Sequence, residues 1–302
     1  MATGKKIGIF ANGSKPLAAA MLARAATKAR ASGMAIVSNA AAPDSDCPFW
    51  EKCDAGGSAF AGCAAILVLG GDGTILEAIH RIGTGVAPFL GVNIGSLGYL
   101  AAVGAARLEE AMDAVANGEL DVSPRSMLAL SVARADGSRL DIPMSALNEA
   151  VLSRSTGRIV RMALELNGTR VMDYSCDGII VATPTGSTAY SLSAGGPLVT
   201  PGADAIIVNV ICPHALSSRP IIVSGDTKIS IRPAKAEAPL SLAVDGEDAG
   251  TVCIGDSLEI AVSPKVAEIA FLKGHSDFAI LARKLGWAGS SLGRETKEGE
   301  GL

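Results

Sequence analysis

The chain is organised around the segment Ala64-Ala65-Ile66-Leu67-Val68-Leu69-Gly70-Gly71-Asp72-Gly73-Thr74-Ile75-Leu76-Glu77-Ala78-Ile79-His80. The apolar run up to Leu69 is bounded by glycine and predicts a fully buried strand, whereas the run from Ile75 predicts the start of a helix. Glycines at the turn let backbone N–H groups approach a phosphate closely, and the helix N-terminus beyond adds partial positive charge. The stretch therefore predicts a phosphate loop made of Gly70, Gly71, Gly73 and Thr74.

The carboxylate of Asp72 stands in this loop where an anion should bind. In a mere phosphate cradle it would repel the ligand, so one interpretation gives Asp72 a role in chemistry or in metal binding. The other interpretation is a tight turn in which Asp72 caps the helix. These five residues alone leave both open.

Further strand and helix segments surround this stretch in the N-terminal part of the chain. Strands are predicted over 7–11, 34–38 and 88–92, and helices over 17–31, with Ser14 as N-cap, and 107–117, ended by Gly118. Residues 39–62 are expected to be loop-like with a short helix. The glycine-rich segment 93–100 follows a strand, as Gly70–Thr74 does, so both loops belong at the carboxyl edge of a parallel sheet, where ligands of open α/β folds bind.

After about residue 120 the pattern changes to strand after strand. Turn signals at Asp136-Gly137 and Asn167-Gly168 predict hairpins. Strands are predicted over 127–133, 158–166, 170–176, 179–182, 205–211, 220–223, 228–232, 240–244 and 258–262. We therefore predict an open parallel α/β domain over 1–122, joined by the segment 268–302, and a mainly β domain of two packed layers over 123–267. A helix over 277–285 is expected to return to the first domain, and the tail 289–302 to be disordered.

The composition limits the classes of function. The chain has 302 residues, is 49% hydrophobic with a formal charge of −4, and contains only 4% aromatic residues, so we expect no nucleic-acid partner. Neither a signal peptide nor a membrane-spanning run is evident, so no membrane partner is expected. Six cysteines without a Cys-x-x-Cys pair indicate reduced thiols in a cytoplasmic protein, although Cys47, Cys53 and Cys63 leave a local metal or redox cluster open.

A second chemically informative segment runs from Asp177 to Pro197. A buried strand leads into Thr183-Pro184-Thr185-Gly186 and then into a helix start rich in hydroxyl groups. Such a helix start donates N–H and hydroxyl groups to a base edge, a ribose or a phosphate, and Tyr190 is placed to stack on a base. The alternative is a hydroxyl-capped helix with ordinary packing of Tyr190. The polar pair Asn148-Glu149 interrupts an apolar segment and suits a ribose or base, or simply a strand edge.

Together these segments resemble the ATP-dependent NAD kinase family of the bacterial type. The segments that carry the resemblance occur in the family's order and cover the chain from about Lys5 to Trp287: Gly70–Thr74, Asn148-Glu149, Asp177–Pro197, Cys212–Pro220, Val244-Asp245-Gly246 and Lys284-Leu285-Gly286-Trp287. Each motif alone is weak, but the set is highly specific.

The resemblance implies transfer of the γ-phosphate of ATP to the 2′-hydroxyl on the adenosine ribose of NAD, giving NADP. It implies that Asp72 accepts the proton of that hydroxyl and that Mg²⁺, or another divalent cation, accompanies ATP, with no metal-ligating residues assigned in the chain. It also implies a homo-oligomer, a dimer or tetramer, in which a neighbouring subunit completes the NAD pocket. The residues implied to bind NAD are Asp72, Gly73, Asn148, Glu149, Arg161, Ser175, Asp177, Thr185, Thr188, Ala189, Tyr190, Ser191, Leu192, Ser193, Asp245 and Glu247.

Three positions depart from the family pattern, namely Glu77, Ser96 and Glu247, and they concern the phosphate donor and the choice between NAD and NADH. Two other functions stay open at this point. One is a lipid kinase that shares the glycine-aspartate loop, which the 183–193 segment disfavours. The other is a catalytically silent protein that binds NAD or NADP, which the presence of Asp72 disfavours.

Overall fold

The structure is a computed structural model that describes residues 5–44, 47–95 and 98–287. The chain forms two compact units, of which unit 1 comprises Met1–Ser123 and Glu268–Leu302 and unit 2 comprises Pro124–Ala267. Position 96 and the tail 289–302 lie outside the described residues. No helix in the described part of the chain has both the length and the apolar character that a membrane crossing needs.

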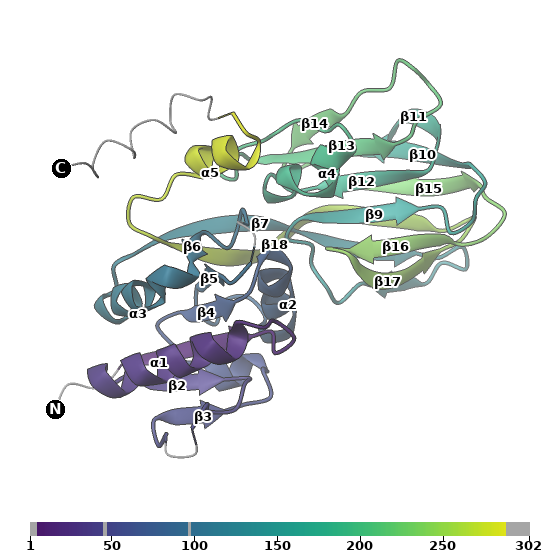
Figure 1. Cartoon of the computed structure of the whole chain (residues 1–302). Helices are drawn as coiled ribbons and strands as arrows, with labels where there is room; N and C mark the ends of the chain where they lie inside the picture. The colour runs from purple at the N-terminus through teal and green to yellow at the C-terminus, as the bar shows by residue number, and fades with distance from the viewer. Residues whose placement is uncertain (1–4, 45–46, 96–97, 288–302) are drawn as a thin grey trace. The chain divides into compact units, whose positions relative to one another are not determined.

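Unit 1 contains a parallel sheet (Figure 1). The end of β18 (Ser257–Leu272) pairs with β5, and the sheet continues in the order β5-β4-β1-β2-β3, with β6 beside β5. The strands are β1 (Lys6–Ala11), β2 (Ala35–Ser38), β3 (Trp50–Lys52), β4 (Ile66–Leu69), β5 (Phe89–Asn93) and β6 (Val103–Gly104). The predicted parallel α/β architecture is confirmed, and the segment expected to be loop-like contains β3 as well as a short 3₁₀ helix, η1 (Gly57–Phe60).

Helices cover both faces of this sheet because its strands are apolar on both sides. Leu90 and Val92 of β5 belong to the core formed with α1 (Ala18–Ser32) and α3 (Leu108–Asn117). The residue between them, Gly91, points to the other face, where an added Cβ would lie 2.5 Å from Ile75 of α2 (Asp72–Ile82). A glycine at this position therefore lets α2 lie close to the sheet. The remaining helices of unit 1 are η2 (Ala105–Arg107) and α5 (Asp277–Lys284).

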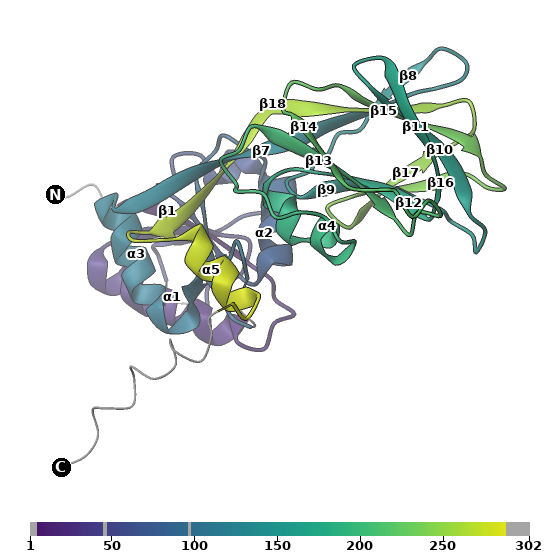
Figure 2. The ribbon, with the colours of Figure 1, turned by 90° about the horizontal axis from the view of Figure 1, so that it is seen from above.

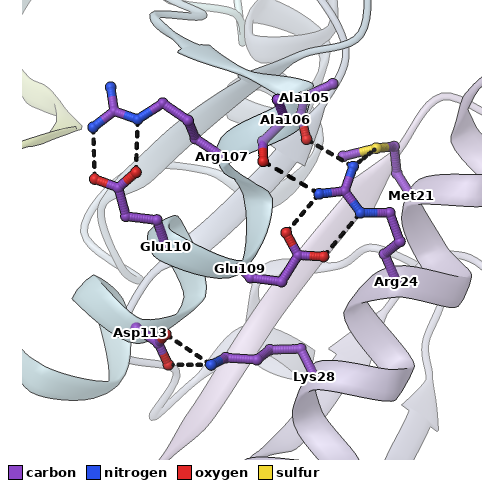
Figure 3. A network of polar contacts seen from close by, with 9 residues as sticks. All are labelled: Met21, Arg24, Lys28, Ala105, Ala106, Arg107, Glu109, Glu110 and Asp113. Atoms are coloured by element: carbon purple, nitrogen blue, oxygen red, sulfur yellow. Dashed lines mark hydrogen bonds and ion pairs between the residues drawn. The ribbon is translucent and has the colours of Figure 1, made fainter.

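Ion pairs join α1 and α3, which lie side by side in Figures 1 and 2. Figure 3 shows the guanidinium of Arg24 against the carboxylate of Glu109, with Nε 2.8 Å from Oε1, and Lys28 against Asp113 one turn further along both helices. Arg24 also donates to the carbonyl of Ala105 at 2.9 Å. These polar contacts thus hold α1 against α3 beside the apolar side chains that pack between the two helices.

The start of α1 differs from the prediction. The N-cap residue is Leu17, and no side chain caps the helix. Ser14 instead donates its N–H and its hydroxyl to the side chain of Asn12, at 3.0 and 2.7 Å. The Asn12 side chain therefore forms a turn that occupies the residue expected to cap the helix.

Unit 2 is a two-layer β structure, as predicted, and Figure 2 shows the two layers one above the other. One layer has the order β11-β10-β15-β18, with β7 beside β18 and β8 beside β7; the other has the order β14-β13-β12-β9-β16-β17. The elements are β7 (Leu120–Ala133), β8 (Arg139–Asp141), β9 (Glu149–Ser153), β10 (Val160–Leu166), β11 (Thr169–Cys176), β12 (Gly178–Ala182), η3 (Thr185–Thr188), α4 (Tyr190–Ser193), β13 (Ala205–Ile211), β14 (Ile221–Ser224), β15 (Ile229–Lys235), β16 (Leu240–Val244) and β17 (Glu247–Val252).

Alternation along the strands builds the core between the layers. Val160, Met162 and Leu164 of β10 point into this core, whereas Arg161 is exposed, as predicted. The hairpin at Asn167-Gly168 is confirmed, with both residues in the left-handed region at φ 51° and 76°.

Candidate active site

Asp72 lies where strand β4 gives way to helix α2. The N-cap residue of α2 is Gly71, and no side chain caps the helix. The Asp72 carboxylate turns instead to the segment after β5, where Oδ2 accepts the N–H of Tyr99 at 2.7 Å and Oδ1 accepts those of Leu100 and Ala101 at 2.9 and 3.0 Å. The interpretation of Asp72 as a helix cap is therefore wrong. The prediction that the two loops meet at one edge of the sheet is confirmed.

The residues next to the Asp72 carboxylate leave space for it and pair with its charge. A Cβ added to Gly98 would overlap the Asp72 carboxylate, so a glycine is needed there by close approach. The ammonium nitrogen of Lys284, on α5, lies 3.6 Å from Oδ2, and the Asp72 side chain is 30% exposed. Asp72 is thus held by N–H groups on one side and is reachable from solvent on the other.

In the loop around Asp72, the first glycine is closely packed against a side chain, whereas the other two have free space beside them. At Gly70 an added Cβ would overlap the side chain of Thr74, which is buried. At Gly71 and Gly73 an added Cβ would meet nothing within 4 Å. The open side of the loop leaves room for a ligand beside its backbone.

A second carboxylate, that of Asp245 in unit 2, also binds a short run of backbone. Asp245 stands in the turn between β16 and β17 in the left-handed region, at φ 50°. Its oxygens accept the N–H groups of Leu147, Asn148 and Glu149 at 2.8, 2.7 and 3.0 Å, and its own N–H donates to the carbonyl of Glu149 at 3.0 Å. The Asn148-Glu149 pair is therefore fixed by an acidic residue far along the chain.

The Thr-Pro-Thr-Gly turn holds the same segment from another direction. Thr183 donates its hydroxyl to the carbonyl of Leu147 at 2.6 Å and its N–H to that of Asn148 at 2.9 Å. At Gly186 an added Cβ would overlap the backbone of Asn148. The structure thus brings the 183–186 turn, the Asn148-Glu149 pair and Asp245 together, three segments that are separate in sequence.

Glu149 is a buried acid with an unused oxygen. It is only 6% exposed, and its Oε2 atom has no hydrogen-bond partner among the described residues. Burial, and after it the negative charge of Asp245, raises the pKa of Glu149 to about 7, although a backbone hydrogen bond from Tyr190 acts in the opposite direction. At neutral pH this carboxyl group can therefore either donate or accept a hydrogen bond.

The hydroxyl-rich segment after the turn is only partly available to a ligand. Ser187 is buried and donates its hydroxyl to the carbonyl of Pro184 at 2.6 Å, and Thr188 donates to that of Thr185 at 3.1 Å. Ser191 is also fully buried, but its hydroxyl has no partner in the described part of the chain. Among the other candidates in this segment, Thr185 is buried, Ala189 and Leu192 are half-buried, and Tyr190 and Ser193 are exposed.

Asp177 borders a pocket of about 270 Å³ that also includes Tyr190. Its carboxylate faces the guanidinium of Arg154, with Nε 2.8 Å from Oδ1 and Nη2 3.2 Å from Oδ2. Arg154 was not predicted as a site residue, because a single arginine at the end of a strand belongs to no recognisable sequence motif. The same pocket contains Ser153, Ser155, Thr156 and Ile211.

The three remaining candidates lie on other parts of unit 2. Arg161 of β10 is exposed and lies opposite Ser175 of β11, whose carbonyl accepts the N–H of His214 at 2.9 Å. Glu247 is exposed at the start of β17, directly after the Asp245-Gly246 turn. In the described residues, no three His, Cys, Asp or Glu side chains come together as a metal site.

Comparisons with known proteins give one consistent family. A model of the ATP-NAD kinase N-terminal domain matches residues 18–120, and a model of the ATP-NAD kinase C-terminal domain matches residues 147–272. An NAD kinase from Symbiobacterium thermophilum is 37% identical over 290 residues, which is 93% of this chain and 98% of the relative. An NAD kinase from Lachnoclostridium phytofermentans is 39% identical over 225 residues, 73% of this chain and 79% of the relative.

Solved structures show the same architecture. The crystal structure of an NAD kinase from Archaeoglobus fulgidus in complex with ATP has 26% identity and a TM-score of 0.70, covering 94% of this chain and all of the other. Yeast NADH kinase complexed with NADH has a TM-score of 0.83 over 95% of this chain and 89% of its own, and at 24% identity it supports the fold.

Proposed function

This chain belongs to the ATP-NAD kinase family and is an ATP-dependent NAD kinase, and we propose that Asp72 accepts the proton in its reaction. The reaction transfers the γ-phosphate of ATP to the 2′-hydroxyl on the adenosine ribose of NAD and yields NADP. Membership of this family excludes the lipid kinase raised by the sequence, and the presence of Asp72 in its glycine loop disfavours the silent NAD-binding protein. Both domain models that match are those of ATP-NAD kinases.

The setting of Asp72 is the observation that supports its role. Phosphoryl transfer depends mainly on positioning and charge neutralisation, with one carboxylate to orient or deprotonate the attacking hydroxyl. The three N–H groups from residues 99–101 fix the Asp72 carboxylate, and its exposed edge remains accessible. In the proposed step the 2′ oxygen forms a bond to the γ-phosphorus, its proton passes to Asp72, and the bond from the γ-phosphorus to the β,γ-bridging oxygen breaks, so that ADP leaves.

We propose that the open glycine loop, Gly70, Gly71, Gly73 and Thr74, binds the phosphates of ATP. Its glycines at 71 and 73 leave space beside the backbone, and the N-terminus of α2 starts there. N–H groups at a helix start favour an anion by their partial positive charge. Glu77 is paired with Arg81 at 3.3 Å, so its departure from the family pattern adds little free negative charge near this loop.

We propose that unit 2 supplies most of the NAD site. Glu149 and Ser191 each have a buried side-chain oxygen without a hydrogen-bond partner among the described residues. Buried polar groups normally form hydrogen bonds, so these two oxygens are expected to bind a ligand. Asp177 and Tyr190 border one pocket. Further proposed contacts are Asn148, Arg161, Ser175, Thr185, Thr188, Ala189, Leu192, Ser193 and Glu247. Asp245 is proposed to act through residues 147–149, because its oxygens already accept their N–H groups.

We propose that Mg²⁺ enters with ATP. The described residues contain no cluster of three acidic, His or Cys ligands, and the Asp72 carboxylate already accepts three N–H groups, so this part of the chain does not present a cage for a metal ion. The ion would neutralise phosphate charge when bound. Treatment of the free protein with EDTA should therefore leave its Tm unchanged within error. A clear fall in Tm would reveal a metal ion held by the protein itself.

We propose a homo-oligomer, which the family resemblance implies, and a cytoplasmic location, which the cysteine pattern of the sequence indicates. All six cysteines are free in the structure, in agreement with a reducing compartment. Light scattering of the purified protein would test the expected dimer or tetramer, and a monomer at working concentration would contradict it.

The function is tested by incubating the protein with ATP, Mg²⁺ and NAD and measuring NADP with an NADP-specific dehydrogenase. Replacing Asp72 by asparagine should lower turnover by about 10²–10⁴, the usual contribution of general-base assistance, while NAD still binds. Near-normal turnover in this variant would contradict the role of Asp72 but not the kinase assignment, because the wild-type protein reports on the latter.

A further inference from the structure

The glycine loop lacks a basic residue of its own. Residues 70–74 read Gly-Gly-Asp-Gly-Thr, and the next residues up to Ile79 include Glu77 but no lysine or arginine. A triphosphate brings several negative charges to a loop that already carries Asp72. Phosphate loops of other nucleotide-binding proteins meet this demand with a lysine that reaches the β- and γ-phosphates. A cation for this loop must therefore come from elsewhere in the protein, in addition to the metal ion that accompanies ATP.

A basic side chain that reaches the loop is that of Lys284, from the last turn of α5. Its ammonium nitrogen lies 3.6 Å from Oδ2 of Asp72, and all the elements involved belong to unit 1. The Lys284 side chain is 32% exposed, so it is free to turn on its flexible stem. An ammonium group this close to Asp72 is also close to whatever binds against the free edge of that carboxylate.

We propose that Lys284 is a catalytic residue whose ammonium group binds the γ-phosphoryl group in the transition state of its transfer. Before ATP binds, the same ammonium group forms an ion pair with Asp72. This inference rests on the proposed role of Asp72. As the 2′-hydroxyl proton passes to Asp72, the carboxylate loses its charge and its hold on the ammonium group. At the same moment the equatorial oxygens of the γ-phosphoryl group need a cation, and Lys284 meets them without gaining or losing a proton.

The contact does not have the features of a structural ion pair. Ile280 is the buried residue of α5, while Phe278 on the same helix and Trp287 just beyond it are 67% and 63% exposed. An ion pair that is one-third exposed contributes little to folding. Removing the charge of Lys284 should therefore change catalysis much more than stability.

Substitution at Lys284 tests the inference, with Arg283 as a matched control on the same helix. Lys284→Met should lower kcat for NADP formation by about 10²–10³, the usual effect of removing one donor that stabilises transition-state charge. The KM for NAD and the Tm should stay close to wild type. Lys284→Arg should restore much of the rate, because a guanidinium also binds phosphoryl oxygens. The Arg283 side chain is exposed, so Arg283→Met should behave as wild type.

A second measurement separates charge from side-chain shape. Ethylammonium added to a Lys284→Ala variant should raise its rate in a saturable way, and an uncharged alcohol of the same size should not. The inference is overturned if Lys284→Met keeps a rate within threefold of wild type, if Arg283→Met loses as much, or if the loss appears only as a lower Tm or a higher KM for NAD. NADP formation by the wild-type protein tests the proposed function separately.

Discussion

Glu149 makes the stability of unit 2 depend on pH. The pKa of this buried carboxyl is raised from 4.5 to about 7, mainly by burial and then by the charge of Asp245. A raised pKa means that the folded chain favours the neutral form of Glu149. The contribution of this neutral carboxyl group to the free energy of unfolding is therefore complete below pH 4.5 and is lost as the pH rises through about 7. Each pKa unit corresponds to about 1.36 kcal/mol, so the loss between these two pH values is about 3 kcal/mol in the free protein.

Replacing Glu149 by glutamine removes this dependence. The amide has the shape of the neutral acid but cannot ionise, so the variant should equal wild type near pH 4.5 and exceed it by up to about 3 kcal/mol above pH 8. Hydrogen exchange of peptides from β9 and β12, compared between the two proteins at each pH, measures this difference within unit 2 even if the units unfold separately.

Glu237 offers a control for this measurement. Its side chain is 56% exposed and pairs with Arg158 on the surface, so Glu237→Gln should change the stability of unit 2 by no more than about 1 kcal/mol. A difference between wild type and Glu149→Gln that stays constant from pH 4.5 to 8.5 would refute the argument. A midpoint near the ordinary value of a glutamate would do the same.

Two other predictions follow from contacts in unit 1. Gly98→Ala should lower turnover by about 10-fold or more, because its Cβ would displace the Asp72 carboxylate from the position in which we propose that it accepts the proton. Gly104→Ala, where an added Cβ meets nothing within 4 Å, should be normal in the NADP assay. Equal effects at both glycines would contradict this. A double-mutant cycle on Arg24 and Glu109, whose side chains are 38% and 41% exposed, should give a coupling energy of about 0.5–1 kcal/mol that shrinks in high salt; a larger value that salt does not change would show that the pair is effectively buried.

Local sequence patterns predicted most of the fold because the relevant physics is local. A buried strand such as Ile66–Leu69 is apolar throughout, and the Asn167-Gly168 pair suits the left-handed backbone of a tight hairpin. The edge strand Glu247–Val252 was missed because it is mostly exposed and polar, so it carries no apolar alternation. Ser14 was misassigned as a cap because a competing side chain, that of Asn12, lies two residues away.

The arrangement of the candidate site could not be predicted because it depends on contacts between distant residues. Asp72 accepts N–H groups from residues 27 to 29 positions away, and Asp245 from residues 96 to 98 positions away. Nothing in the sequence distinguishes a carboxylate that binds backbone from one that faces a ligand. The family resemblance implied a function for both residues, but only the structure reveals that each holds a loop in place.

Because the Asp72 carboxylate both binds backbone N–H groups and is the proposed proton acceptor, its substitution is expected to have two effects. In Asp72→Asn the amide oxygen can keep the two N–H bonds from Leu100 and Ala101, but the amide nitrogen then replaces Oδ2 and faces the N–H of Tyr99. One hydrogen bond is lost, which typically costs about 0.5–1.5 kcal/mol and more where a charge is involved. A modest fall in stability should therefore accompany the loss of turnover. Because a lost general base can account for a drop of about 10²–10⁴ in rate and a slightly weakened loop cannot, the size of the kinetic effect distinguishes the two roles of Asp72.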